Sequence, residues 1–258
     1  RAARILEEAE YLRAAREIFG FLRTAMWEEG KLLRVFRNGR ASDLHGYLDD
    51  YAYVLAGVVE LFQADPATDY IEFANELALA MVERFGDPEA HGLHYSSTEN
   101  HDSLPVRRKD FQDEAIPAAN LVAASALLRI AELTGREPAR NLAAGIVAAA
   151  CRPARQYPQA FTSTWNAVDS LHGPLETLIV VRSEDRAGES ALADSARRMY
   201  APNRLVCLVT REEAGELAAR LSLFDAKECV RGIDTAYLCR GRTCLPPVTS
   251  PEELRELE

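Results

Sequence analysis

Acidic residues stand at the start of two apolar helices that the sequence predicts. Asp49 and Asp50 open the helix in "GYLDDYAYVLAGVVELF", and Asp113 lies shortly before the helix that follows Pro117. A pair of carboxylates can act as general base and general acid, or bind the hydroxyl groups of a polyhydroxylated ligand. The field of a helix N-terminus lowers a carboxylate pKa, which suits a base better than a proton donor. We therefore expect Asp49 or Asp50 as the catalytic base and Asp113 as the second carboxylate.

The same aspartates also have a structural interpretation. Aspartate is favoured at helix N-caps and in first turns, because its carboxylate accepts hydrogen bonds from unpaired backbone N–H groups. Asp49 and Asp50 are adjacent on a helix and point about 100° apart, so at most one of them faces a given ligand. Capping and acid–base chemistry both stay open for each of these residues.

Two tyrosines and an asparagine beside the acids are predicted binding residues. Tyr47 and Tyr51 share a helical face, where their rings either stack on a sugar or pack in the core. In the register of an internal repeat, Tyr51 corresponds to Asn120, and an asparagine in an apolar helix must find partners if it is buried. We expect both polar tips to project into one cavity.

Lys109, Asp110 and His45 complete the predicted binding set. Lys109 and Asp110 precede the second apolar helix, and they form either a structural ion-pair network or part of a binding site. His45 comes directly before the acidic motif and is a candidate proton shuttle, because imidazole titrates near neutrality. Capping of its loop is the alternative role for this histidine.

A polar loop contains His91, His94 and His101 with Glu99 and Asp102. This composition suggests zinc at first sight, but the spacing matches no standard zinc motif. The segment "VVRSEDRAGES" has a single glycine and lacks a phosphate-binding glycine pattern. The sequence therefore predicts neither a metal nor a cofactor.

The five cysteines are odd in number and unevenly spread, unlike the disulfide framework of a small secreted domain. Reduced thiols are the default expectation. Cys239 and Cys244 are the most distinctive pair, but their spacing differs from the C-x-x-C of thioredoxin motifs. They are predicted to be either two reduced thiols at a strand edge or a closing disulfide.

Composition excludes several classes of function. The chain has 258 residues, 48% of them hydrophobic, and a formal net charge of −10, which indicates a globular protein with a large core. The negative charge argues against nucleic acid or an anionic membrane as a partner. No apolar run reaches the roughly 20 residues of a membrane span, and the N-terminus lacks the features of a signal peptide. We expect a cytoplasmic protein or an internal fragment.

Repeated helical hairpins position the candidate residues. The pattern that begins at Tyr11 recurs at Tyr70, as the second helix of a hairpin, and each copy leads through a glycine into a short predicted β-excursion. A first helix also recurs, since the stretch that begins at Val58 aligns with the stretch that begins at Leu127 at an offset of 69 residues. Alanine crowds the later copy, so it should pack closely on both sides as an inner helix. Residues 1–173 are therefore predicted to be an α-helical hairpin region.

The pattern changes at Pro174. Residues 174–258 contain the runs "LETLIVV", "RLVCLVT" and "TAYLCRG", alternating with charged helical segments. This order predicts a small α/β unit with a parallel sheet. Ser250 and Pro251 have the residue types of an N-cap and a first helical position, which predicts a final helix.

Four stretches together resemble the C-terminal part of the spermatogenesis-associated protein 20 family, whose bacterial members are named thioredoxin domain-containing proteins. They are "GYLDDYA" at 46–52, "RRKDFQDEAIPAAN" at 107–120, "YAPN" at 200–203 and "AYLCRGRTCLPPVTSPEEL" at 236–254. The second stretch departs from the common family form, roughly K-D-x-x-D-G-A-x-P-S-G-N. Here Glu114 replaces a glycine, and two alanines replace Ser-Gly.

The resemblance implies a thioredoxin-like domain followed by a six-hairpin (α/α)6 toroid, as in N-acylglucosamine 2-epimerases and several glycoside hydrolases. These residues contain no thioredoxin domain and too few hairpins for a whole toroid, so we expect a partial toroid. In such toroids the inner helices bring their N-termini to one rim, where the acids would meet. We expect a carbohydrate-related binding or catalytic domain, epimerase-like or hydrolase-like. The alternative is a non-catalytic scaffold that serves an attached thioredoxin-like domain.

Overall fold

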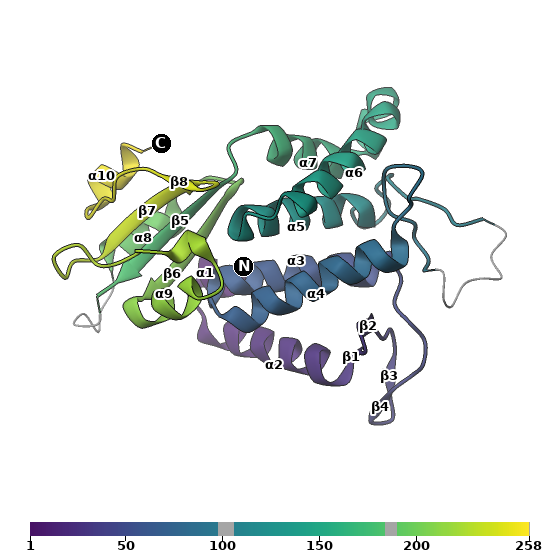
Figure 1. Cartoon of the computed structure of the whole chain (residues 1–258), viewed down its shortest axis with the longest axis horizontal. Coiled ribbons are helices and arrows are strands. Elements are labelled where there is room, and N and C mark those ends of the chain that lie inside the picture. The colour runs from purple at the N-terminus through teal and green to yellow at the C-terminus, as the bar shows by residue number, and fades with distance from the viewer. Residues whose placement is uncertain (98–105, 184–189, 258) are drawn as a thin grey trace.

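A computed structural model describes residues 1–97, 106–183 and 190–257, and it is mainly α-helical as expected (Figure 1). The helices are α1 (Ala2–Leu6), α2 (Ala9–Ala25), α3 (Leu48–Ala64), α4 (Thr68–Phe85), α5 (Ala119–Thr134), α6 (Glu137–Gln156), α7 (Thr162–His172), α8 (Ala191–Arg198), α9 (Arg211–Ala218) and α10 (Pro251–Arg255). The strands are β1 (Trp27–Glu28), β2 (Lys31–Leu32), β3 (Phe36–Arg37), β4 (Arg40–Ala41), β5 (Glu176–Arg182), β6 (Arg204–Thr210), β7 (Thr235–Arg240) and β8 (Thr243–Cys244).

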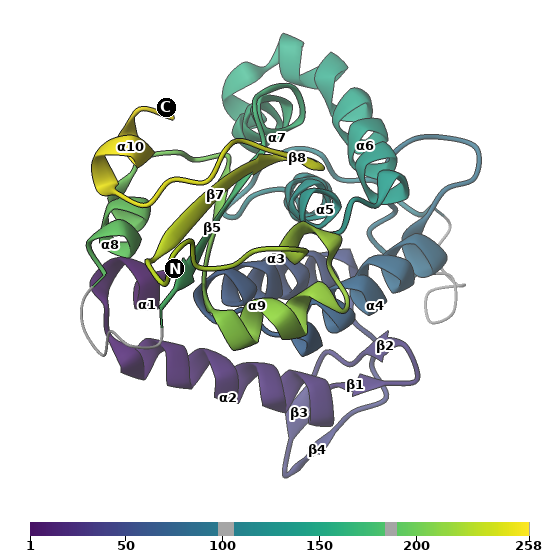
Figure 2. The ribbon, with the colours of Figure 1, turned by 60° about the vertical axis from the view of Figure 1, so that its left-hand side comes forward.

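Helical hairpins form the larger part of the molecule. Helices α3 and α4 make one hairpin and α5 and α6 make the next, while α2 takes the place of the second helix of a preceding hairpin. Helix α5 lies at the centre, packed against α3, α6 and α7 (Figure 2). Its small residues are buried and let its neighbours approach closely, as the sequence predicts. These small buried residues are Ala119, Ala123, Ala124, Ala126 and Ala131.

Only one of the two predicted β-excursions forms. After α2, strands β1 and β2 pair antiparallel, and β3 and β4 make a second small hairpin. After α4, the equivalent residues 86–97 contain bends but no strand. The backbone of this segment bonds elsewhere, since the Leu93 N–H donates to the Asn120 side chain and the Tyr95 N–H donates to the Arg108 carbonyl. These backbone N–H groups are therefore not available for hydrogen bonds to a neighbouring strand.

The C-terminal third builds a four-stranded sheet with the order β6-β5-β7-β8. Strands β5 and β6 are parallel, with α8 in the connection between them. Strand β7 runs antiparallel to β5, and β8 returns antiparallel to β7. The prediction of a parallel sheet was therefore wrong for its third strand. The final helix α10 has Ser250 as N-cap and Pro251 in its first turn, as the sequence predicts.

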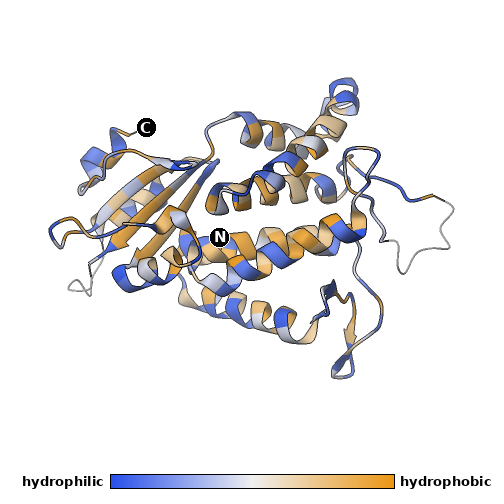
Figure 3. Ribbon diagram, in the orientation of Figure 1, coloured by the Kyte–Doolittle hydropathy of each residue, from blue (hydrophilic) through white to orange (hydrophobic). Residues whose placement is uncertain are grey.

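The sheet is covered on both faces. Alternate residues of β5 point to opposite sides, so Leu178 and Val180 pack with α8 and α10, while Ile179 and Val181 join the core of the helical hairpins. Hydrophobic residues run along the helices of the hairpins and the strands of the sheet (Figure 3). One core therefore extends from the helices onto the sheet. The partial (α/α)6 toroid stays a prediction.

The cysteines correct one expectation. Cys239 and Cys244 pair across β7 and β8 and form a disulfide, so the default of reduced thiols was wrong for this pair. Cys151, Cys207 and Cys229 do not take part in disulfides within the described residues. Cys207 is buried, and burial raises the pKa of its thiol to about 12. In the part of the chain described here, no helix combines the length and the apolar composition that a membrane span requires.

Candidate functional site

A cleft lies where α3 and α5 begin, at the end of the helical hairpins that faces away from the sheet (Figure 1). Its volume is about 450 Å³. The N-termini of two neighbouring helices thus meet at one cavity, as the sequence predicts for its acidic residues. We call this cavity the acidic cleft, and the side chains that give it its chemistry are Asp49, Tyr95, Arg108, Asp110, Phe111 and Glu114.

The two adjacent aspartates of α3 point in different directions. Asp49 lines the cleft, accepts a hydrogen bond from the Tyr95 hydroxyl at 3.2 Å and lies 3.9 Å from the Arg34 guanidinium. Asp50 turns back to its own helix, where it accepts the Tyr47 N–H at 2.9 Å and pairs with Arg34 at 3.2 Å. Burial raises the pKa of Asp50 despite these partners, against the lowered pKa expected from the helix dipole. Asp49 therefore faces the cavity, and Asp50 caps α3.

Aromatic rings and arginines support Asp49 from one side. The rings of Tyr47 and Tyr95 stack, with centroids 5.0 Å apart and planes 14° apart. Arg34 covers the Tyr47 ring and Arg108 covers the Tyr95 ring, at 4.6 and 4.9 Å from the centroids. Tyr47 therefore affects Asp49 only indirectly. It stacks on the Tyr95 ring and fixes its position, and the Tyr95 hydroxyl donates the hydrogen bond to Asp49.

Asp113 lies outside the lining of the cleft and joins two helices. Its carboxylate accepts the Ala118 N–H at the start of α5, and the Ser163 N–H and two hydroxyls at the start of α7. Burial alone would raise the pKa of Asp113, but these hydrogen bonds outweigh it and lower the pKa. The carboxylate thus serves as a double N-cap.

A second carboxylate of the cleft is Asp110. It pairs with Arg108 at 3.1 Å, yet burial raises its pKa, and the nearby charge of Glu114 raises it further. A carboxyl with a raised pKa is better suited to donate a proton than one with a lowered pKa. The cleft therefore combines Asp49 and Asp110, where the sequence predicted Asp49 or Asp50 with Asp113.

Tyr51 and Asn120 are fully buried and hold equivalent loops. The Tyr51 hydroxyl accepts the Leu32 N–H at 2.7 Å. Asn120 accepts the Leu93 N–H at 2.8 Å and donates to the carbonyls of Leu93 and Asp110, at 2.9 and 3.1 Å. Tyr51 of α3 therefore holds the loop that follows α2, and Asn120 of α5 holds the loop that follows α4. The two side chains correspond in the repeat as predicted, but they bond backbone groups and do not line the acidic cleft.

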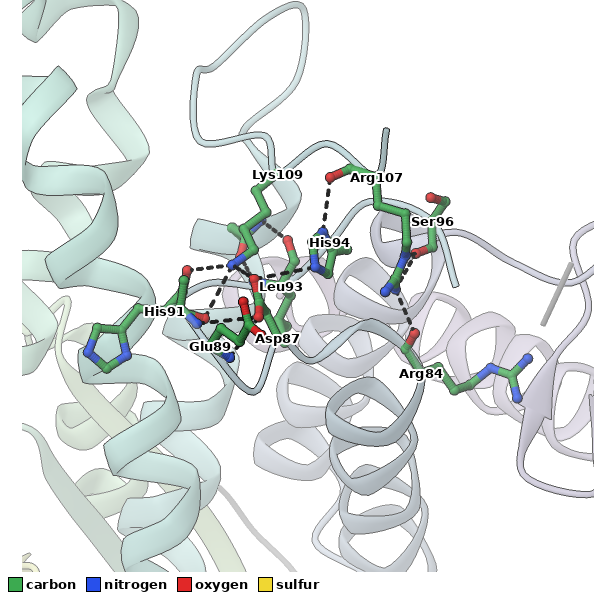
Figure 4. Close-up of polar contacts among 11 residues, drawn as sticks. Arg84, Asp87, Glu89, His91, Leu93, His94, Ser96, Arg107 and Lys109 are labelled. Carbon is green, nitrogen blue, oxygen red and sulfur yellow. Dashed lines mark hydrogen bonds and ion pairs between the residues drawn. The ribbon is translucent and has the colours of Figure 1, made fainter. Parts of the chain in front are cut away.

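Lys109 belongs to a network that holds the loop after α4 (Figure 4). Its ammonium pairs with Asp87 at 2.7 Å and donates to two backbone carbonyls of the loop. Asp87 also lies 3.5 Å from His94 and accepts two backbone N–H groups. The hydrogen bond from Lys109, aided by these N–H groups, lowers the pKa of Asp87 to about 2. Lys109 thus contributes its stem to the cleft wall and its charge to the loop.

The histidines that the structure describes lie apart from one another. The His45 ring lies 3.1 Å from Arg84, away from the lining of the acidic cleft, and the ring of His91 lies against Gly145. His101, together with Glu99 and Asp102, lies outside the described residues. Within residues 1–97, 106–183 and 190–257, no three His, Cys, Asp or Glu side chains come close enough to hold a metal ion.

Sequence reasoning missed Tyr95, Arg108 and Phe111 as parts of the site. Tyr95 lies in a loop that the sequence assigned to a β-excursion, and Arg108 was given no role in the predicted site. The signal available for Arg108 and Phe111 was their position, since they directly flank the predicted residues Lys109 and Asp110. Aromatic residues in loops beside carboxylates are common in ligand sites.

Comparison with known proteins supports a relation to the family that the sequence resembles. The chain is 28% identical to spermatogenesis-associated protein 20 of Homo sapiens over 246 residues, which cover 92% of this chain and 31% of that protein. The protein of the same name from Rattus norvegicus is 29% identical over 212 residues, 82% of this chain and 27% of that protein. An uncharacterized protein of Caenorhabditis elegans is 24% identical over 265 residues, which cover 100% of this chain and 35% of that protein. No family model matches the chain. The chain thus spans about a third of the length of these relatives.

Proposed function

We propose that the acidic cleft binds a polyhydroxylated, carbohydrate-like ligand. The observation that carries the proposal is the lining of the cleft, which combines Asp49 and Asp110 with the aromatic ring of Phe111. Carboxylates accept hydrogen bonds from sugar hydroxyls, and aromatic faces stack on the C–H faces of sugar rings. A volume of about 450 Å³ suits a small ligand of one or two rings.

A catalytic role of the epimerase or hydrolase type is the finer part of this proposal. Asp110 would donate a proton, since burial raises its pKa, and Asp49 would act as the base. The division of roles follows from the environments of the two carboxyl groups. Because the chain spans about a third of its relatives, the reaction of a whole protein would draw on residues beyond these 258.

A non-catalytic scaffold is the second candidate function. The observation in its favour is that Asp50, Asp113 and Asn120 all bond backbone groups of their own or neighbouring segments. In that case the acidic residues serve stability, and the domain would present a surface to another part of a longer protein, such as a thioredoxin-like domain.

A thermal-shift screen with monosaccharides and disaccharides tests the two candidates. A ligand at about 100 times its Kd stabilises the folded state by about 2.7 kcal/mol, which raises the melting temperature of a chain of this size by several degrees. We expect a sugar to stabilise the parent, and to lose this effect in Asp49→Asn and Asp110→Asn. Asp43→Asn is the matched control, because Asp43 is exposed and lies outside the cleft.

Two results would contradict carbohydrate binding. One is a panel in which no sugar shifts the melting temperature of the parent. The other is a sugar whose effect falls as much in Asp43→Asn as in Asp49→Asn. Either result, with all variants folded, favours the scaffold.

A further inference from the structure

A second cavity lies at the starts of β5 and β6, on the sheet and away from the acidic cleft. Its volume is about 350 Å³, and its walls include Glu176, Asn203, Arg204, Arg240 and the ring of Tyr200. Three of these residues occupy neighbouring strands. Glu176 of β5 pairs with Arg204 of β6. On the other side of β5, Thr177 pairs with Cys239 of β7, and Arg240 is the next residue of β7. The sheet thus places one carboxylate between two guanidinium groups.

Both oxygens of that carboxylate are already occupied. Arg204 donates Nε and Nη2 to Oε2 of Glu176, each at 3.0 Å, and Arg240 donates to Oε1 at 2.7 Å. The side chains of Glu176 and Arg204 are each 7% exposed, whereas that of Arg240 is 59% exposed. Two positive charges face one negative charge, so the cluster carries a surplus positive charge beside the cavity.

Two observations go beyond what a structural ion cluster explains. Nη1 of Arg204 is buried and meets no hydrogen-bond partner among the residues that the structure describes. A buried charged donor without an acceptor is costly. Tyr200 is a large aromatic residue that is 90% exposed beside the same cavity. Because Nη1 of Arg204 lies behind the cavity wall, the donors that a ligand oxygen would meet are those of the exposed Arg240 guanidinium, and the Tyr200 ring would cover the rest of the ligand.

We propose that this cavity binds a small oxyanion, a molecule that carries a carboxylate or a phosphate group. Arginine forks match the geometry of both groups, and an exposed aromatic ring fits the carbon skeleton attached to them. The side chain of Asn203 fixes the cavity wall, because it accepts the Ser170 hydroxyl at 2.9 Å and donates to Asp169 at 2.6 Å. The site is independent of the acidic cleft and of the carbohydrate proposal.

Isothermal titration with inorganic phosphate and with succinate, at constant ionic strength, tests this site on the whole chain. We expect the parent to bind at least one of the two anions saturably. Arg240→Gln should weaken that binding at least tenfold, because it removes the exposed guanidinium. Arg242→Gln is the matched control. It also removes one positive charge, but Arg242 is exposed in the turn between β7 and β8, near Gly135 and outside the cavity. It should change the Kd less than twofold.

Tyr200→Ala is the second variant, and it should weaken binding about threefold. The ring is 90% exposed, so its removal leaves the fold intact even if Arg240→Gln reduces stability. Binding of phosphate alone or succinate alone supports the site and identifies its anion. The proposal is overturned if the parent binds neither anion, if Arg242→Gln weakens binding as much as Arg240→Gln, or if Tyr200→Ala has no effect.

Discussion

The buried Asn120 offers the sharpest test of how the site is held. Replacement by leucine keeps the number of side-chain atoms but removes three hydrogen bonds to the Leu93 and Asp110 backbone. Leu93 is fully buried, so its N–H and C=O lose their partners without access to water. Each buried group left unpaired costs about 1–3 kcal/mol. We expect Asn120→Leu to lower the free energy of unfolding by about 3–5 kcal/mol, or the melting temperature by about 10 °C.

Urea titration and amide hydrogen exchange measure this effect. Tyr51→Phe is the graded comparison, because it removes the hydrogen bond from the Leu32 N–H and should cost about 1–2 kcal/mol. Asn166→Leu on the exposed face of α7 is the control and should stay within about 0.5 kcal/mol. The Leu93 amide should exchange faster in Asn120→Leu. A loss below about 1 kcal/mol, with unchanged Leu93 exchange, would refute the argument.

Three further predictions concern charge and sulfur. Asp87→Asn should destabilise the chain at neutral pH, and the difference in unfolding free energy should shrink as pH falls from about 4 to 2, because the depressed pKa of Asp87 supports the fold only above that range. Urea titrations at several pH values check this. Reduction of the Cys239–Cys244 disulfide should lower stability by roughly 2 kcal/mol, because the loop is short, as calorimetry with and without dithiothreitol would measure. Iodoacetamide should leave the buried Cys207 unmodified in the folded chain, as mass spectrometry would show.

Local patterns in the sequence predicted the elements well. The repeat of Tyr11 at Tyr70 marked α2 and α4, and the alanine-rich copy of the first helix marked α5 as the central helix. Runs of β-branched residues located β5 and β6, the stretch "TAYLCRG" located β7, and Ser250 marked the start of α10. These features depend on residues close in the chain, so sequence alone reveals them.

Features that depend on distant residues were not predictable. Asp49 and Asp50 differ in role because Tyr95 arrives from the loop after α4 to meet one of them. Asp113 became a cap because the start of α7 lies beside it. The direction of β7 was also hidden, because a run of β-branched residues does not say which way the chain enters the sheet. Each of these outcomes requires the tertiary arrangement.

The most direct test of the central claim is an NMR titration of the chain with the sugar panel. If the acidic cleft binds a carbohydrate, a sugar should shift the amide signals around Asp49 and Asp110 and give intermolecular NOEs from its C–H protons to the Phe111 ring. Shifts confined to other surfaces, or no saturable shift with any sugar of the panel, would contradict the claim.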